Sequence, residues 1–464
     1  MHPIQITLNH DEPDMERLPA HWEEPVENVT SLNDHGVSQL EAGRYDEAIE
    51  CFKAALSRLE GESTVQYATS PALANPARTS SPTNSIDERS GHSTNSNVSR
   101  DSYIYQRREY DEGMHVFSSP LKMEGPVLGQ IDSHNAAATV ILYNMGQLYL
   151  LQHADEEANE CFVRALFLAR CRKGNTSSSN GGRPNNYPGA VAILHNIGYI
   201  QYRNSELEKA LRTFNEALQV YRHVPNKLEL AATLNCLGVL YFHLPKSDTS
   251  RAMDYYLKSL QIRRELIGNE HRDIATMLNN IGRVHYIKGE YDRAAARYRE
   301  ALDMRRKLLG RDHLDTACAC YNYGQTLHQQ ARLEEALKYY QEFMSITVPK
   351  LGQTHRDVAI MLKCMAQIYH ERREYDRALS LYEEALGVGR AALGMHAEVA
   401  SILNKMGNLY YEQGDFDAAI KRYKQGLEVE RSVLHALHPN ITVTLTNIGQ
   451  IHKQRGEYME ALKL

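Results

Sequence analysis

The sequence of 464 residues has one tryptophan, eight phenylalanines and no apolar run that approaches the length of a membrane span. Its first 24 residues, MHPIQITLNHDEPDMERLPAHWEE, carry neither the charged-then-apolar pattern of a signal peptide nor the arginine bias of a transit peptide. We therefore expect no membrane partner and a cytoplasmic location for this protein.

A basic excess is also missing. The chain has 52 Lys and Arg against 58 Asp and Glu, which gives a formal net charge of −6. Proteins that bind nucleic acid usually show a basic patch or stripe, so we expect no nucleic-acid partner. Cysteine is sparse, and the seven residues are odd in number and fall mostly on predicted helix positions. That pattern is typical of buried thiols in a reducing compartment.

Signatures of catalysis are absent as well. The sequence has no glycine-rich phosphate loop, no HExxH and no nucleophile elbow. Cys318 and Cys320 lie two residues apart on a predicted helix, so they face different directions and do not predict a metal pair. We expect a protein that is not an enzyme and has no cofactor and no metal site.

The chain does contain small residues that recur at a regular spacing. A glycine is followed twelve residues later by an alanine, with an alanine in place of one glycine and a two-residue longer spacing in one unit. The pairs are Gly36/Ala48, Gly146/Ala158, Gly198/Ala210, Gly238/Ala252, Gly282/Ala294, Gly324/Ala336, Ala366/Ala378, Gly407/Ala419 and Gly449/Ala461. From Gly198 onward, successive units start 40, 44, 42, 42, 41 and 42 residues apart. A fixed period in this range indicates a stacked-repeat protein.

One unit, at 275–310, shows what repeats. Its two apolar stripes at helical spacing hold Leu278, Ile281, Gly282 and His285, and then Tyr291, Ala294, Tyr298, Ala301 and Leu302. Gly289 separates the stripes and is a typical end of a helix. The pattern predicts two antiparallel helices joined by a tight turn. Gly282 and Ala294 have almost no side chain, so they would let the two helices approach closely.

Larger residues follow the same rhythm. Four residues after the alanine stands an aromatic side chain: Phe52, Phe162, Phe214, Tyr256, Tyr298, Tyr340, Tyr382 and Tyr423. Seven residues after it a small side chain usually returns, with Phe343 as the exception. The chain resembles the tetratricopeptide repeat at every marker position, over about 36–464 less one insertion. The resemblance implies an all-α fold, a right-handed superhelical α-solenoid of about nine helical hairpins.

The second helix of each unit is long and continues to a glycine, as in MRRKLLG and VPKLG. In this feature the units look like the 42-residue repeats of kinesin light chains and their relatives. Just before the first helices stand His271, His313, His355, His396 and His438. Successive repeats place these histidines one per layer, so we expect a loop or capping role for them rather than a shared metal.

The sequence also predicts the domain organisation. We expect an irregular segment at 1–30, a first repeat at 31–60, a largely disordered insertion at 61–135 with a short hairpin near 103–123, and eight repeats at 136–464 with a mobile loop at 173–189. Ser70, Ser81 and Ser119 each precede proline, but a plain linker is the simpler interpretation of this composition. The chain stops at Leu464 within the second helix of the ninth unit, so we expect either a longer chain or a frayed last hairpin.

Polar side chains follow the first helices, which line the concave side of tetratricopeptide arrays. The candidate peptide-binding residues are Asn144, Asn196, Asn235, Asn279, Asn280, Arg283, Asn322, Gln325, Lys363, Asn404, Lys405 and Asn447. An amide offers both donors and an acceptor, so a row of amides can pair with the backbone of an extended peptide. Arg283, Lys363 and Lys405 would add attraction to acidic residues or a terminal carboxylate.

The family resemblance implies that Asn144, Asn196, Asn280, Asn322 and Asn447 contact a bound peptide. The alternative is that these amides bond to one another along the groove. We therefore expect a scaffold that binds an extended or short helical segment of another protein. A kinesin light chain-like cargo adaptor is a second possibility, although the heptad segment of those proteins is missing here. An accessory array of a larger signalling or nucleotide-switch protein is a third.

Overall fold

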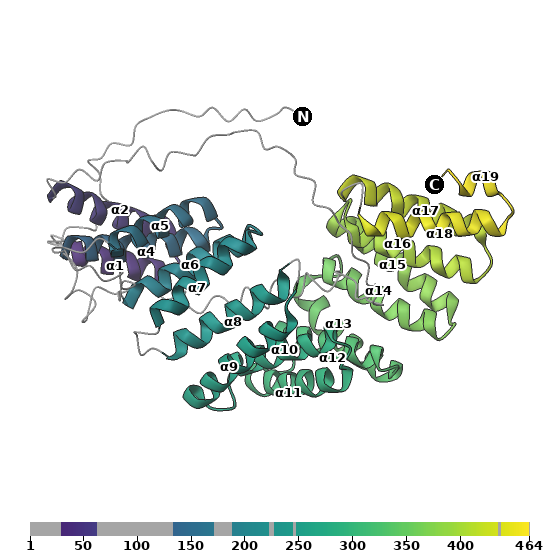
Figure 1. Cartoon of the computed structure of the whole chain (residues 1–464), viewed down its shortest axis with the longest axis horizontal. Coiled ribbons are helices and arrows are strands. Elements are labelled where there is room, and N and C mark those ends of the chain that lie inside the picture. The colour runs from purple at the N-terminus through teal and green to yellow at the C-terminus, as the bar shows by residue number, and fades with distance from the viewer. Residues whose placement is uncertain are drawn as a thin grey trace. The chain divides into compact units, whose positions relative to one another are not determined.

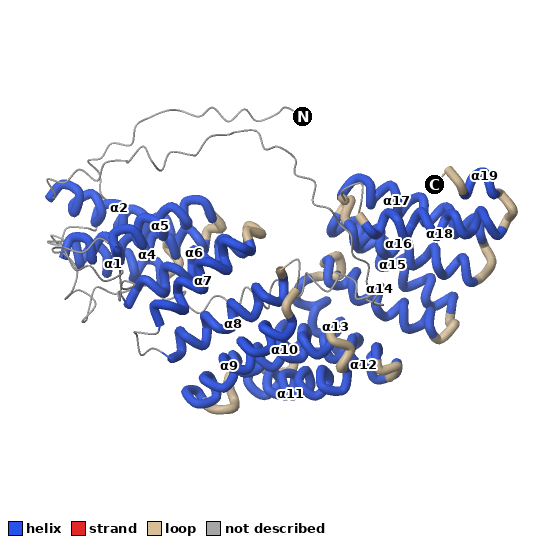
Figure 2. The backbone as a smooth tube through the Cα atoms, viewed as in Figure 1, coloured by secondary structure: helices blue, strands red, loops and turns tan. Residues whose placement is uncertain are grey.

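The computed structural model describes residues 29–62, 133–170, 188–221, 227–244, 247–434 and 438–463. All regular structure within these ranges is helical (Figure 2). Most of the predicted irregular segment at 1–30, most of the insertion at 61–135 with its hairpin near 103–123, and most of the loop at 173–189 lie outside the described residues. Where these segments are described, at 29–30, 61–62, 133–135 and 188–189, they are helical, so the helices extend beyond the predicted boundaries.

The described helices form consecutive antiparallel pairs in two compact units. The first unit holds α1 (Val29–Glu41), α2 (Tyr45–Glu62), α4 (Ser133–Leu151), α5 (Asp155–Arg170), α6 (Pro188–Arg203) and α7 (Leu207–Tyr221). Each helix in it packs against the next one along the chain. Each of its three helix pairs contains one glycine–alanine pair: Gly36/Ala48, Gly146/Ala158 and Gly198/Ala210.

The second unit continues the pairing. It holds α8 (Lys227–His243), α9 (Thr249–Ile267), α10 (Arg272–Ile287), α11 (Tyr291–Leu309), α12 (Leu314–Gln329), α13 (Leu333–Leu351), α14 (Arg356–Glu371), α15 (Tyr375–Leu393), α16 (Ala397–Glu412), α17 (Phe416–Val433), α18 (Pro439–Gln454) and α19 (Tyr458–Ala461). In Figure 1, α14 to α18 lie in one group, and each of them contacts the next one along the chain. The predicted all-α solenoid of helical hairpins is confirmed.

The turn within each pair forms as the sequence predicts. In the unit at 275–310, α10 ends at Ile287 and Gly289 takes a φ of +73°, the left-handed region that glycine adopts at little cost. The amide of Glu290 then donates a hydrogen bond of 2.9 Å to the carbonyl of His285. The second helix, α11, runs 19 residues to Gly310, which confirms the long second helix.

In seven of the hairpins, the glycine of the first helix makes room for an aromatic ring rather than for the alanine alone. A Cβ atom built on Gly282 would lie 3.0 Å from ring atoms of Tyr298, and one on Gly407 would lie 2.6 Å from the ring of Tyr423. The same relation holds between Gly146 and Phe162 in the first unit, at 2.7 Å. The aromatic residues four positions after each alanine therefore reach across the hairpin to the first helix.

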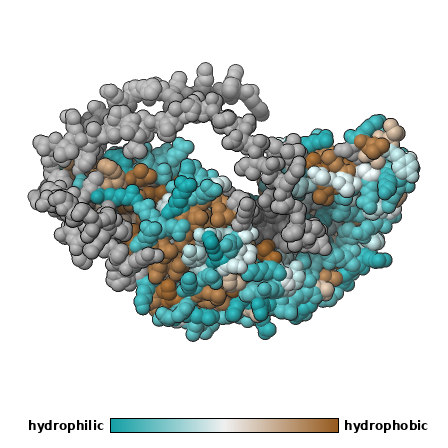
Figure 3. Space-filling view, viewed as in Figure 1, coloured by the Kyte–Doolittle hydropathy of each residue, from teal (hydrophilic) through white to brown (hydrophobic). Residues whose placement is uncertain are grey.

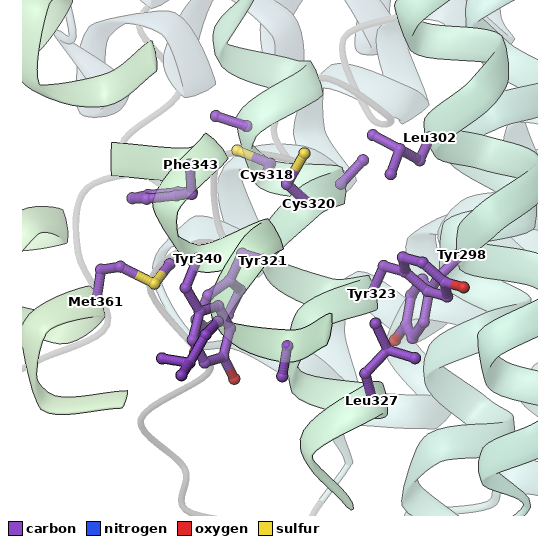
Figure 4. Packing of buried hydrophobic residues seen from close by; sticks show 14 of the residues in the cluster. Tyr298, Leu302, Cys318, Cys320, Tyr321, Tyr323, Leu327, Tyr340, Phe343 and Met361 are labelled. Atoms are coloured by element: carbon purple, nitrogen blue, oxygen red, sulfur yellow. The ribbon is translucent and has the colours of Figure 1, made fainter. Parts of the chain in front are cut away.

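The core continues from one repeat to the next instead of closing into a single centre. One cluster joins Tyr298 of α11 with Tyr321 of α12, Tyr340 and Phe343 of α13, and Met361 of α14 (Figure 4). In α10 every residue from Ile274 to Val284 is buried. Burial between neighbours is the way in which solenoids supply each repeat with a core.

Candidate functional site

The histidines before the first helices cap those helices. The Nδ1 atom of His271 accepts a hydrogen bond of 3.1 Å from the backbone N–H of Asp273. His313, His355, His396 and His438 accept the matching bond at 3.1 to 3.2 Å. This geometry satisfies one of the unpaired N–H groups at each helix start and confirms the capping role.

The asparagines of the first helices form an inter-repeat amide ladder. Asn322 Nδ2 donates to Asn279 Oδ1 of the preceding repeat at 2.9 Å, and Asn280 Nδ2 donates to Asn235 Oδ1 at 3.1 Å. Asn235, Asn279 and Asn280 are buried. These amides therefore bond to one another, which is the alternative that the sequence left open.

The first unit repeats this bond. Asn144 Nδ2 donates to Asn33 Oδ1 at 3.0 Å, and both residues are fully buried. Asn196, at the same position in the next repeat, is also buried. The amide nitrogen of Asn196 has no hydrogen-bond partner among the described residues, so the bond is not repeated there. The bonds of the ladder are those that Asn144, Asn280 and Asn322 donate.

Two of the predicted basic residues also interact with other side chains inside the array. Lys363 Nζ lies 2.8 Å from Glu398 Oε2, and the two side chains are only 8% and 4% exposed. The guanidinium of Arg283 lies 4.3 Å from the ring centroid of Phe242, and Arg283 is buried. Their charges are therefore held inside the repeats rather than displayed on a surface.

Asn404 has a similar internal role. Its Nδ2 atom donates to Glu430 Oε1 at 2.9 Å and to Thr444 Oγ1 at 2.8 Å. A Cβ atom on Gly426 would lie 2.5 Å from Asn404 Oδ1, so the small residue at position 426 leaves the space that this amide occupies.

In the last four first helices, the side chains one and five residues after the small residue are more exposed than the asparagines of the ladder. We call these, in α12, α14, α16 and α18, the first-helix row: Gln325, Gln329, Gln367, Glu371, Asn408, Glu412, Gln450 and Gln454. Each of its members is half-buried or exposed. In Figure 3 the surface in the right-hand part of the view, where α14 to α18 lie in Figure 1, is mostly hydrophilic.

Hydrogen bonds to buried tyrosines orient two members of this row, and a third bond joins two members to each other. Gln325 Nε2 donates to Tyr321 Oη at 2.6 Å, and Gln367 Nε2 donates to Glu371 Oε1 at 3.1 Å. Asn408 Oδ1 accepts from Tyr423 Oη at 2.6 Å. The bonds leave the carbonyl oxygens of the two glutamines and the amide nitrogen of Asn408 as the groups available to a ligand.

The remaining candidates, Asn322, Lys405 and Asn447, are half-buried. Of the first-helix row, only Gln325 is among the predicted candidates. The other members share its helical spacing, one or five residues after the small residue.

The cysteines do not form a reactive centre. Burial raises the pKa of Cys236 and of Cys320 to about 12, and that of Cys161 to about 11. Their thiols therefore stay protonated near neutral pH, while the nucleophile in cysteine chemistry is the thiolate. Among the residues that the structure describes, no group of three or more His, Cys, Asp and Glu side chains is arranged to hold a metal ion.

Comparison of the sequence with protein-family models agrees with the paired helices and the regular glycine–alanine spacing. The tetratricopeptide repeat model matches residues 189–265, 246–307, 273–347, 357–432 and 398–464, and a second model of the same repeat matches residues 29–58. The chain belongs to the tetratricopeptide repeat family.

Solved tetratricopeptide structures resemble it at low sequence identity. The apo quorum sensor NprR from B. thuringiensis is 15% identical, with a TM-score of 0.50 over 72% of this chain and 83% of that chain. A STAND signal-transduction ATPase with a tetratricopeptide repeat sensor, from Pyrococcus horikoshii, is 14% identical, with a TM-score of 0.49 over 78% of this chain and 51% of that chain. BtubC (BKLC) from P. vanneervenii is 19% identical, with a TM-score of 0.42 over 52% and 93%.

No curated protein sequence matches this tetratricopeptide chain. None of its described helices is long and apolar enough to span a bilayer.

Proposed function

We propose that this tetratricopeptide protein is a non-enzymatic protein–protein interaction scaffold that acts in the cytoplasm. Its ligand is an extended or short helical segment of a partner protein, bound on the first helices of the second unit. The observation that carries the proposal is the orientation of Gln325 and Asn408 by hydrogen bonds with the buried tyrosines Tyr321 and Tyr423. Polar groups held in place before binding lose less conformational entropy when a ligand arrives.

The residues that we propose to contact the ligand are not the same as the asparagines predicted from the sequence. Asn235, Asn279 and Asn280 are buried in the ladder, so a ligand would have to displace inter-repeat bonds to reach them. Asn322, Lys405 and Asn447 are half-buried and stay in the proposed set beside the first-helix row. Backbone recognition by amides tolerates varied side chains, which suits a scaffold.

Proximity labelling followed by mass spectrometry would identify the partner, and a substitution pair would then test the surface. Gln367→Ala with Gln450→Ala should lower affinity about tenfold, because each lost hydrogen bond contributes about 0.5–1.5 kcal/mol. The matched control is Gln261→Ala, an exposed amide on the second helix α9. Unchanged binding by the double variant, with weaker binding by the control, would place the ligand on the second helices and refute the proposal.

A narrower function is a kinesin light chain-like cargo adaptor, which the 42-residue spacing of the units favours. A pull-down with the full chain distinguishes it from a general scaffold. Recovery of motor heavy chains would support the adaptor, and recovery of partners without them would favour the scaffold.

A further inference from the structure

We propose that a pocket at the turns of the second unit binds the guanidinium group of an arginine side chain of a partner protein. The pocket lies between the α10–α11 turn and the α12–α13 turn, and its lining residues do not belong to the first-helix row. It is therefore a second contact surface, and the inference goes beyond the peptide site proposed above.

The pocket has a volume of about 440 Å³ and is lined by Gly289, Tyr291, Asp292, Gln330 and Arg332. Pockets that bind small ligands usually measure about 300–1,000 Å³. A Cβ atom built on Gly289 would meet nothing within 4 Å, so the wall is open at this turn. Tyr291 is half-buried and Asp292 is exposed, so both residues offer accessible surface to a ligand.

The junction of α17 and α18 shows how a guanidinium fits this combination of residues. There Phe416 and Asp417 hold the positions of Tyr291 and Asp292, three and two residues before the repeat alanine. Arg455 Nη2 lies 2.7 Å from Asp417 Oδ1, and Arg455 Cζ lies 5.8 Å from the ring centroid of Phe416. A cation that meets an aromatic ring and a carboxylate together is stabilised by both contacts.

The arginine of that junction is missing at the pocket. Arg455 stands six residues after the repeat glycine of its first helix, and the same position in α12 is Gln330. Gln330 Nε2 donates to Asp292 Oδ1 at 2.7 Å, so a neutral amide contacts the aspartate in place of a cation. The pocket therefore lies where an arginine side chain binds in the junction of α17 and α18.

Four junctions of the second unit allow this comparison. Arginine stands at the position in α14 and α18, as Arg372 and Arg455, and Arg372 Nη1 lies 2.5 Å from Glu334 Oε1. Glutamine stands there in α12 and α16, as Gln330 and Gln413. An arginine of the chain itself thus binds the acidic residue in two junctions, and the pocket at Gln330 is open to an arginine of a partner.

The neighbouring charges do not compete for this place. Arg332 binds Glu335 through two hydrogen bonds, Nε to Oε1 at 2.8 Å and Nη2 to Oε2 at 2.7 Å. Glu290 accepts a hydrogen bond of 3.2 Å from Arg293. Both carboxylates thus have a cation of their own, whereas the bond to Asp292 comes from an amide. A guanidinium in the pocket would therefore neutralise Asp292 without displacing an ion pair.

Titration of the full chain with the capped pentapeptide Ser-Gly-Arg-Gly-Ser, followed by NMR, tests the inference. We expect shifts of the backbone amides of Gly289, Asp292 and Gln330. The same peptide with citrulline in place of arginine should shift them little, because citrulline has nearly the same shape and no charge. A peptide with lysine should bind several-fold more weakly, since an ammonium lacks the planar face that stacks on an aromatic ring.

Two variants separate the pocket from other acidic surfaces. Asp292→Asn should weaken binding of the arginine peptide about fivefold, as expected for the loss of an exposed ion pair. Gln330→Arg should abolish binding without lowering the melting temperature, because the new side chain would bind Asp292 as Arg455 binds Asp417. The control is Asp254→Asn, a change of an exposed acid on α9, which should bind as the wild type does.

Equal shifts with the arginine and citrulline peptides would overturn the pocket as an arginine site. Arginine binding that survives both Asp292→Asn and Gln330→Arg would overturn it as well, and so would the absence of shifts at millimolar peptide. None of these results affects the peptide site on the first helices, which the substitutions of Gln367 and Gln450 test separately.

Discussion

Asn322 of α12 donates a hydrogen bond of 2.9 Å from its amide nitrogen to the side-chain oxygen of Asn279 in the preceding repeat. The two residues are 43 positions apart in the sequence, about one repeat. The same bond recurs between Asn280 and Asn235, so the interaction ties α10 to α8 and α12 to α10.

Replacing Asn322 by alanine should destabilise this junction. Asn279 is 3% exposed, so its amide oxygen would lose a partner in a buried place, at a cost of about 1–3 kcal/mol. Hydrogen exchange should show faster opening of α10 and α12 than of α16. Gln329→Ala, on the exposed end of the same helix, serves as the control, and equal effects of the two changes would argue against a structural ladder.

A second prediction concerns the contact between Gly407 and Tyr423. A Cβ atom at position 407 would lie 2.6 Å from the tyrosine ring, so Gly407→Ala should lower stability by about 1–3 kcal/mol through overpacking. Alanine favours helices more than glycine does, which offsets at most about 1 kcal/mol.

Gly387 in α15 is the matched control for this change. A Cβ atom there would meet nothing within 4 Å, so Gly387→Ala should raise stability by up to about 1 kcal/mol. Urea unfolding of the two variants should move in opposite directions. Movement in the same direction would mean that helix propensity, rather than ring contact, explains the glycine at position 407.

The helical hairpin could be predicted from the sequence, but the side-chain contacts between neighbouring repeats could not. The turn at Gly289 and the caps at His271 and its equivalents could be predicted because each depends on residues close in the chain. The role of Asn280 could not, because α10 is buried from Ile274 to Val284 and its periodicity has no single outer face. Whether an amide meets a ligand or a neighbouring repeat depends on contacts about 40 residues away.

The buried ion pair of Lys363 and Glu398 replaces an arginine found in other repeats. Arg263 and Arg305 are buried eleven residues after their alanines. Arg263 pairs with the carboxylate of Asp273, and Arg305 donates to the backbone carbonyl of Asp315, each the second residue of the next first helix. The equivalent position in α15 is Gly389, and the acidic residue there, Glu398, pairs with Lys363 at 2.8 Å. The cation therefore comes from the preceding first helix, α14, instead of from a second helix.

Removing one partner of this pair should be far worse than removing both. Lys363→Met or Glu398→Gln alone leaves a buried group without its partner, and breaking such a pair costs about 3–5 kcal/mol. The double variant should recover a large part of that loss, because no charge stays buried. A double-mutant cycle measured by urea unfolding gives the coupling, and additive losses would show that the two side chains act independently.

The acid sensitivity of the first unit should depend on His195. Burial lowers the pKa of this histidine to about 3, whereas an unfolded histidine titrates near about 6.5. Between these values the unfolded chain binds a proton that the folded chain does not. The contribution of His195 to stability is therefore complete above about pH 6.5 and decreases by about 1.4 kcal/mol for each pH unit below it.

His195→Asn provides the test, because asparagine stands at the same position in Asn235 and Asn279 and does not titrate. Hydrogen exchange of α6 and α7 should slow relative to the wild type as the pH falls from 6.5 to 4.5, after correction for intrinsic exchange. His243 of α8, whose pKa burial lowers to about 4, stays in both proteins and keeps the second unit acid-sensitive. If α6 and α7 open equally with acid in both proteins, a group other than His195 sets their pH dependence.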